Sequence, residues 1–200
     1  QLLDLGMSGG ASRILIDEKD HRASGRYADT MVTIGIIRIA VGFLVAAAAW
    51  LAGPFAVTLL SIPEHFSGAF PVLLGLQGTV EAATLATFLF STPLYAHNRQ
   101  DLLGWSQTGL FIVFYISLLA GFLFGWGLYA MVFSSFCGLL WGSAFAFLAS
   151  AKLGFLPTKG EWRGFNSSSF MRVFHISKDI FLMGLGWQLL SGSPVLIVSR

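Results

Sequence analysis

The sequence predicts an all-α fold, a polytopic bundle of membrane-crossing helices. Three observations predict it: the composition, the long apolar runs and the distribution of basic residues along the chain. Of the 200 residues, 55% are hydrophobic and only 11% are charged, and the mean hydropathy is +0.73. A soluble domain carries about 25% charged residues, because its surface faces water. Helices that face lipid need no such polar surface.

The apolar runs locate the expected helices. A helix needs about 20 mostly apolar residues to cross a hydrocarbon core of about 30 Å. We expect a single transmembrane region over residues 1–200, with helices at 2–16, 30–53, 69–95, 105–124, 128–150 and 179–198. The first run is short and the last ends close to Arg200, so we expect the chain to be a fragment of a longer protein.

The stretches between these helices predict the orientation. Two of them, 54–68 and 125–127, contain no Lys or Arg. The alternate stretches 17–29, 97–101 and 151–177 hold the basic residues Lys19, Arg22, Arg26, Arg99, Lys152, Lys159, Arg163 and Arg172. Because cytoplasmic loops of membrane proteins carry an excess of Lys and Arg, we expect these three loops in the cytoplasm.

Glycines at four-residue spacing predict close contacts between helices. The pairs are Gly6/Gly10, Gly121/Gly125 and Gly138/Gly142. Small residues at this spacing let helix backbones approach closely in lipid.

Signatures of soluble enzymes are absent from the sequence. The histidines His21, His65, His97 and His175 lie on separate stretches without metal-ligand spacing. The sequence contains no GxSxG elbow and no phosphate-binding GK[ST] loop, and Cys137 lies within an apolar run. We therefore expect no enzymatic activity, no cofactor, no metal and no nucleic-acid partner.

Four ionisable residues lie inside apolar runs: Asp4, Arg13, Arg38 and Glu81. Each costs about 2.5–3.5 kcal/mol at the centre of a membrane helix, so a functional or structural reason is required. Arg13 lies about one turn from the cytoplasmic end of its run, where snorkelling to headgroups explains it as well as a cavity does. Arg38 lies about 12 Å into its run, where snorkelling is strained and a water-filled cavity is favoured.

Glu81 is the deepest of these residues, near the middle of the run 69–95. Polar residues lie before and after it at helical spacing, interrupted by Phe88. They form the stripe Gln77, Glu81, Thr84, Ser91 and Tyr95. Such a stripe should face protein or a wet cavity. Two interpretations stay open: a role in transport, or an interhelical hydrogen bond made by a protonated Glu81.

Several features together resemble the polysaccharide-biosynthesis flippases of the multidrug/oligosaccharidyl-lipid/polysaccharide exporter superfamily. The run Leu2-Leu3-Asp4-Leu5-Gly6, followed by Arg13 and a charged loop, is similar to their second helix. The order of elements also matches: a long helix, a short external stretch with Pro63, a tightly joined helix pair and a longer basic loop.

The resemblance implies two helical lobes around a central cavity that opens alternately to each side. Its substrate would be an undecaprenyl-pyrophosphate-linked oligosaccharide, flipped across the bacterial inner membrane beside glycan polymerase or ligase machinery. Arg13 and Arg38 would then attract the pyrophosphate, and Gln77 and Tyr95 would contact sugar. Glu81 would gain and lose a proton in an ion-coupled cycle.

Other classes remain open from the sequence. Within the superfamily these are a cation-coupled multidrug exporter and a peptidoglycan-precursor flippase. Drug exporters favour acids and aromatics over cations in the cavity, so Arg38 argues mildly against one. A membrane-embedded glycan-processing enzyme and a non-transporting scaffold are the alternatives from other classes.

Overall fold

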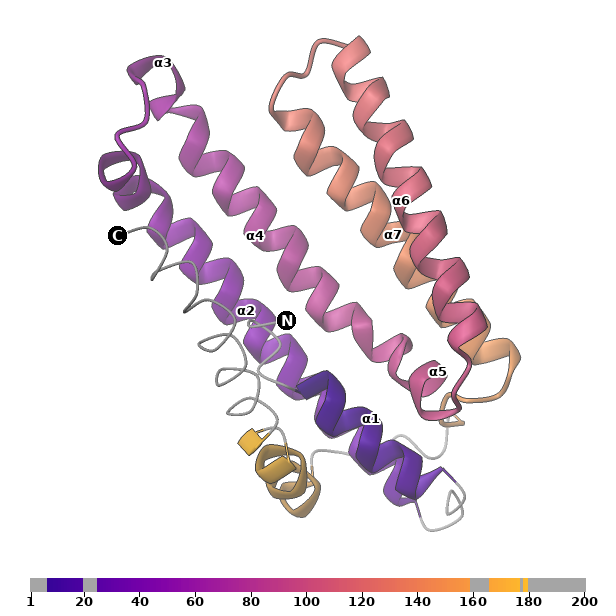
Figure 1. Cartoon of the computed structure of the whole chain (residues 1–200). Coiled ribbons are helices and arrows are strands. Elements are labelled where there is room, and N and C mark those ends of the chain that lie inside the picture. Colours follow the sequence, from indigo (N-terminus) through magenta and orange to yellow (C-terminus); the bar gives the residue numbers. More distant parts are fainter. Residues whose placement is uncertain (1–6, 20–24, 159–165, 177, 180–200) are drawn as a thin grey trace, which may run out of the picture. The chain divides into compact units, whose positions relative to one another are not determined.

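The computed structural model describes residues 7–19, 25–158, 166–176 and 178–179, and every regular element in these ranges is helical (Figure 1). The expected all-α class is therefore confirmed. The elements are α1 (Met7–Glu18), α2 (Arg26–Leu59), α3 (Glu64–Ser67), α4 (Ala69–Thr87), the 3₁₀ turn η2 (Phe88–Phe90), α5 (Thr92–Ala96), α6 (Gln100–Leu123) and α7 (Tyr129–Lys152).

Four stretches of helix among the described residues are long and apolar enough to cross a membrane. They are Arg26–Leu59, Glu64–Phe90, Gln100–Leu123 and Tyr129–Lys152. The chain is accordingly a membrane protein. The expected helix at 2–16 corresponds to α1 in its described part, and the expected helix at 179–198 lies outside the described residues, apart from residue 179.

The long helix α2 extends beyond both expected ends, 30 and 53. Pro54 predicts a stop, because proline lacks the backbone N–H that would bond to the carbonyl four residues earlier. The helix nevertheless continues through Pro54 to Leu59. Membrane helices tolerate proline where neighbouring groups or local adjustments compensate for the lost bond.

The expected single helix at 69–95 is instead three consecutive elements. α4 tightens into the 3₁₀ turn η2 at Phe88, and the chain rewinds as α5, which carries Pro93 in its first turn. Pro93 cannot donate to Leu89, four residues earlier, so the regular α-helical bonding is interrupted at this point.

The helices α6 and α7 form the expected pair joined by a tight turn. Gly125 and Gly127 have φ angles of +76° and +54°, a region that only glycine enters without strain. α6 begins at Gln100, five residues before the expected 105, and α7 spans Tyr129–Lys152 rather than 128–150.

The chain divides into two compact units. The first unit comprises the described parts of 1–34 and 157–200, and the second comprises 35–156. In the first unit, α1, the start of α2 and the segment 166–176 surround buried Leu15, Met31 and Val173.

A buried carboxylate joins the three segments of the first unit. Glu18 is only 6% exposed. Its Oε2 accepts a hydrogen bond of 2.7 Å from the Thr30 hydroxyl, and its Oε1 accepts one of 2.6 Å from Nη1 of Arg172. Glu18 was expected to lie in the charged loop 17–29, whereas α1 in fact ends with it.

The expected loop 151–177 contains a helical segment at 167–176. Asn166 caps this segment, because its Oδ1 accepts a hydrogen bond of 3.0 Å from the backbone N–H of Ser168. The backbone N–H of Asn166 in turn donates to the Thr33 hydroxyl of α2 at 3.4 Å. The cap thus fixes the segment beside the start of α2.

Small residues set the distance between α2 and α4 in the second unit. A methyl group added to Gly42 would lie 2.8 Å from the carbonyl oxygen of Ala82, and one added to Gly78 would lie 2.2 Å from Cβ of Ala49. The helices run antiparallel at this contact, since later residues of α2 meet earlier residues of α4. Such close approach stabilises helix pairs in lipid.

Glycines also define the α6–α7 hairpin. The indole of Trp141 covers Gly109, and Leu110 lies over both Gly138 and Gly142. The expectation that Gly138 and Gly142 lie at a helix contact is confirmed. Of the pair Gly121/Gly125, Gly121 packs against Ala130 and Gly125 belongs to the turn.

Candidate functional site

The residues that the sequence singled out fall into separate groups in the structure. Gln77 and Glu81 lie one turn apart on α4. Arg38 of α2 and Tyr95 of α5 lie against the same ring, that of Phe88. Arg13 lies on α1 in the first unit, with its side chain exposed.

Arg38 is fully buried, with 0% of its surface exposed. Its Cζ lies 4.6 Å from the centroid of the Phe88 ring. A guanidinium over an aromatic face is attracted by the ring quadrupole, by about 2 kcal/mol when the pair is desolvated. The contact of α2 with the η2 turn holds this arrangement, since Gly35, one turn before Arg38, packs against Leu89.

The contacts of the Phe88 ring were not predicted from the sequence. Its ring stacks on that of Tyr95 with centroids 5.8 Å apart and planes inclined by 26°. In the sequence Phe88 interrupts the polar stripe, whereas in the structure its ring contacts both Arg38 and Tyr95. The available signal was the seven-residue spacing of Phe88 and Tyr95, which places two residues on one helix face.

Glu81 lies inside the membrane-length stretch Glu64–Phe90. It follows Ala69 by about 18 Å along the axis of α4, and the stretch ends nine residues later, about 14 Å further on. Its Oε1 accepts a hydrogen bond of 3.3 Å from the amide of Gln77. Of the predicted stripe, Gln77, Glu81 and Thr84 lie on α4, where Glu81 and Thr84 are exposed. Ser91 and Tyr95 follow the break at η2 and belong to a different environment.

A partly open pocket lies beside Glu81, between α4, α6 and α7. Its volume is about 320 Å³. We call it the mid-bundle pocket, and its lining residues are Val80, Glu81 and Thr84 of α4, Leu110, Phe111, Phe114 and Tyr115 of α6, and Ser135, Gly138 and Leu139 of α7. The contributing residues of α6 and α7 lie near the middle of these helices. The pocket consequently lies near the mid-length of α6 and α7.

Two of the three hydroxyls of this lining, those of Thr84 and Ser135, bond to their own helices, and the third belongs to Tyr115. Thr84 donates to the carbonyl of Val80 at 2.9 Å, and Ser135 donates to the carbonyl of Met131 at 3.0 Å. The protons of these two hydroxyls are therefore engaged, whereas the phenol of Tyr115 can donate as well as accept a hydrogen bond.

One end of the second unit is closed by a compact core. Leu94, Leu103 and Ala146 are buried together there. The Ser150 hydroxyl donates a hydrogen bond of 2.8 Å to the carbonyl of Phe90, beside the break after α4. This bond ties the end of α7 to the η2 turn.

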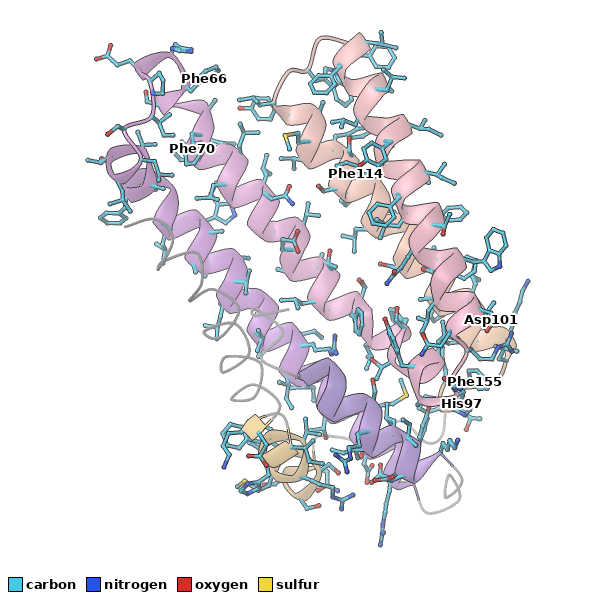
Figure 2. The ribbon with its side chains drawn as sticks, in the orientation of Figure 1. Phe66, Phe70, His97, Asp101, Phe114 and Phe155 are labelled. Carbon is cyan, nitrogen blue, oxygen red and sulfur yellow. The ribbon has the colours of Figure 1, made fainter. Side chains whose placement is uncertain are left out.

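Aromatic and charged side chains mark the same end (Figure 2). The rings of His97 and Phe155 stack with centroids 3.8 Å apart. Arg99 makes two hydrogen bonds, of 3.0 and 2.8 Å, with the carboxylate of Asp101. The hydrogen bond to Asp101 raises the pKa of Arg99, so the guanidinium stays positively charged opposite the Asp101 carboxylate.

Within the described part of the chain, no three His, Cys, Asp or Glu side chains gather closely enough to hold a metal ion. Comparisons of the chain with protein-family models, curated proteins and solved structures find no match. The resemblance to the flippase family accordingly rests on the residues and element order given above.

Proposed function

We propose that this protein is a membrane transporter that flips an undecaprenyl-pyrophosphate-linked oligosaccharide across the bacterial inner membrane. The observation that carries the proposal is the placement of ionisable groups inside a membrane bundle. Arg38 is fully buried on α2, and Glu81, within the membrane-length stretch Glu64–Phe90, lines the mid-bundle pocket. Charged groups within membrane-crossing segments are costly and mark substrate or ion pathways. The resemblance of 2–6 and Arg13 to the flippase family supplies the substrate class.

The proposed mechanism follows from the chemistry of the substrate. A pyrophosphate and its sugars cannot cross hydrocarbon unaided, and a guanidinium binds phosphate oxygens through paired hydrogen bonds. Because Phe88 covers Arg38 in this conformation, access of a pyrophosphate to Arg38 requires the ring to move. The 3₁₀ turn at Phe88–Phe90 is the point at which the backbone departs from regular helix, so a shift there would uncover Arg38 and Tyr95 together.

The test is transfer of a lipid-linked oligosaccharide between leaflets in proteoliposomes that contain the full-length protein. We expect Arg38→Ala to abolish transfer while the protein inserts normally. Arg38→Lys should keep part of the activity, because a point charge attracts phosphate but lacks the planar fork. Arg99→Ala is the matched control, since Arg99 pairs with Asp101 at the end of the bundle. Wild-type transfer by Arg38→Ala would contradict the proposed role.

Glu81 gives a second test, of the coupling to a proton gradient. Glu81→Gln preserves shape and the contact with Gln77 but cannot gain or lose a proton. We expect this variant to insert normally and to lose transfer driven by an imposed pH gradient. A purely structural Glu81 predicts undiminished transfer, because a neutral Glu and a Gln both bridge helices.

A further inference from the structure

We infer that the η2 turn is a gate over Arg38, and that the hydroxyl of Ser150 at the end of α7 holds this gate closed. The inference deepens the proposed function and rests on it for the anion that the gate would admit. The gate itself rests on the contacts that the three residues of η2 make with α2 and α7. All of these contacts lie within the second unit.

The first two residues of η2 lie against α2. The ring centroid of Phe88 lies 4.6 Å from Cζ of Arg38, whose side chain is fully buried. One turn earlier on α2, a Cβ added to Gly35 would lie 3.0 Å from the side chain of Leu89. A movement of η2 away from α2 would therefore lift the Phe88 ring from the guanidinium and open a path to it.

The third residue of η2, Phe90, is held by α7 through both its backbone and its side chain. Its carbonyl accepts a hydrogen bond of 2.8 Å from the hydroxyl of Ser150, which is fully buried. Its ring meets that of Phe147 edge to face, with centroids 5.2 Å apart. Phe147 and Ser150 are three residues apart and so are neighbours on one face of α7. The turn is thus anchored to α7 on one side and covers Arg38 on the other.

The backbone at η2 is less firmly bonded than that of a regular helix. A 3₁₀ turn has poorer hydrogen-bond geometry than an α-helix, and such a turn within a longer helical stretch often marks a hinge. Pro93 has no N–H to donate to the carbonyl of Leu89. The Ser150 hydroxyl adds a bond to the turn from another helix. We call this bond the latch, because a displacement of α7 that breaks it would free η2 to move.

The test measures how fast phenylglyoxal, a reagent that modifies arginine, reacts with Arg38 in the purified full-length protein in detergent. Mass spectrometry of the peptides gives the modified fraction of Arg38, relative to the exposed Arg13 in the same sample. We expect Ser150→Ala to speed the reaction at Arg38 about fivefold, the shift that loss of one hydrogen bond produces in an opening equilibrium. An unchanged rate at Arg38 in the folded variant would overturn the latch.

The matched control is Ser134→Ala. Ser134 is also a fully buried serine of α7, but its hydroxyl donates a hydrogen bond of 2.6 Å to the carbonyl of Ala130 in its own helix. We expect this variant to leave the rate at Arg38 unchanged. An equal acceleration by Ser134→Ala and Ser150→Ala would show a general loosening of the bundle and would overturn the inference.

A second variant tests the cover directly and keeps the test decisive if Ser150→Ala does not fold. Phe88→Ala removes the ring that lies over the guanidinium, so we expect the reaction at Arg38 to be accelerated at least as much as by Ser150→Ala. An unchanged rate would refute Phe88 as the gate.

The outcome can be separated from that of the proposed function, because the modification assay contains neither oligosaccharide nor a pH gradient. If the gate is wrong, Arg38→Ala should still abolish transfer while Ser150→Ala leaves the reactivity of Arg38 unchanged. If the flippase function is wrong, the reactivity of Arg38 should still rise in Ser150→Ala.

Discussion

Glu18 in the first unit and Gly78 in the second both lie where helices touch, but they make the contact in opposite ways. Glu18 links three segments through its carboxylate, which accepts from Thr30 and Arg172. Gly78 contributes no side chain at all and lets the backbone of α4 approach Ala49. The first unit is thus joined by charged hydrogen bonds, and the second by small residues opposite larger ones.

The difference follows from the surroundings that each unit is expected to meet. The first unit contains the basic stretch 17–29, which the charge distribution assigns to the cytoplasmic side. The Arg172 side chain is 47% exposed, so solvent reaches its outer part. The second unit contains most of the membrane-length helices. Their surroundings in lipid are as apolar as a leucine side chain, so burying such a side chain against another helix gains little. Packing of small residues, rather than the hydrophobic effect, then drives helix association.

The largest expected effect is on the α2–α4 contact. Gly78→Leu should lower the free energy of unfolding by about 3 kcal/mol or more, because even its Cβ would lie 2.2 Å from that of Ala49. Gly104→Leu is the matched control, since nothing lies within 4 Å of a Cβ added to Gly104. The measurement is the thermal unfolding midpoint of the detergent-purified protein, and equal midpoints for the two variants would refute packing control of this interface.

A smaller effect is expected in the first unit. Glu18→Ala removes the acceptor for the buried Thr30 hydroxyl and for Arg172, and should cost about 2 kcal/mol. A double-mutant cycle of Glu18→Gln with Arg172→Gln should give a measurable coupling of about 0.5–1 kcal/mol, small because Arg172 is half exposed. This coupling should fall at high salt, whereas the effect of Gly78→Leu should not. Additive single effects would show that the ion pair does not hold the unit together.

The indole–threonine contact of the second unit should have a modest effect. Nε1 of Trp50 donates a hydrogen bond of 3.1 Å to the Thr79 hydroxyl, and the indole ring covers Gly75. Trp50→Phe keeps most of the packing and loses the hydrogen bond, so we expect a loss of about 1 kcal/mol. Thr79→Val removes the same bond and should add little in the double variant. A full additive loss in the double variant would contradict a shared bond.

The smallest effect is expected at the ion pair of the loop 97–101. Asp101 and Arg99 are 56% and 38% exposed, and exposed pairs contribute little because water and salt screen them. Asp101→Asn should leave the unfolding midpoint unchanged within error at 150 mM salt, a concentration at which the Debye length is about 8 Å. A clear destabilisation would mean that charge also stabilises the second unit, and the contrast between the units would fail.

Much of the fold could be predicted from the sequence, because a membrane imposes one-dimensional constraints. Backbone groups in lipid must bond within their own segment, so a run of apolar residues such as 105–124 or 128–150 can only be a helix. Gly125 and Gly127 predicted the tight turn, because glycine adopts backbone angles that other residues avoid. The predicted helix ends were less accurate, since Pro54 predicted a stop at a point where α2 continues to Leu59.

The contacts between residues far apart in the sequence were decided by the tertiary structure. Glu18 and Arg172 are 154 positions apart, and nothing in the local pattern of either stretch indicates the other. The sequence identified Arg38, Glu81 and Tyr95 from the cost of polar groups in lipid. It could not tell that Phe88 lies between Arg38 and Tyr95, or that α6 supplies an aromatic wall beside Glu81. Helix formation depends on neighbours a few residues apart along the chain, whereas the pocket depends on which faces of three helices meet, and that is fixed only when their side chains pack.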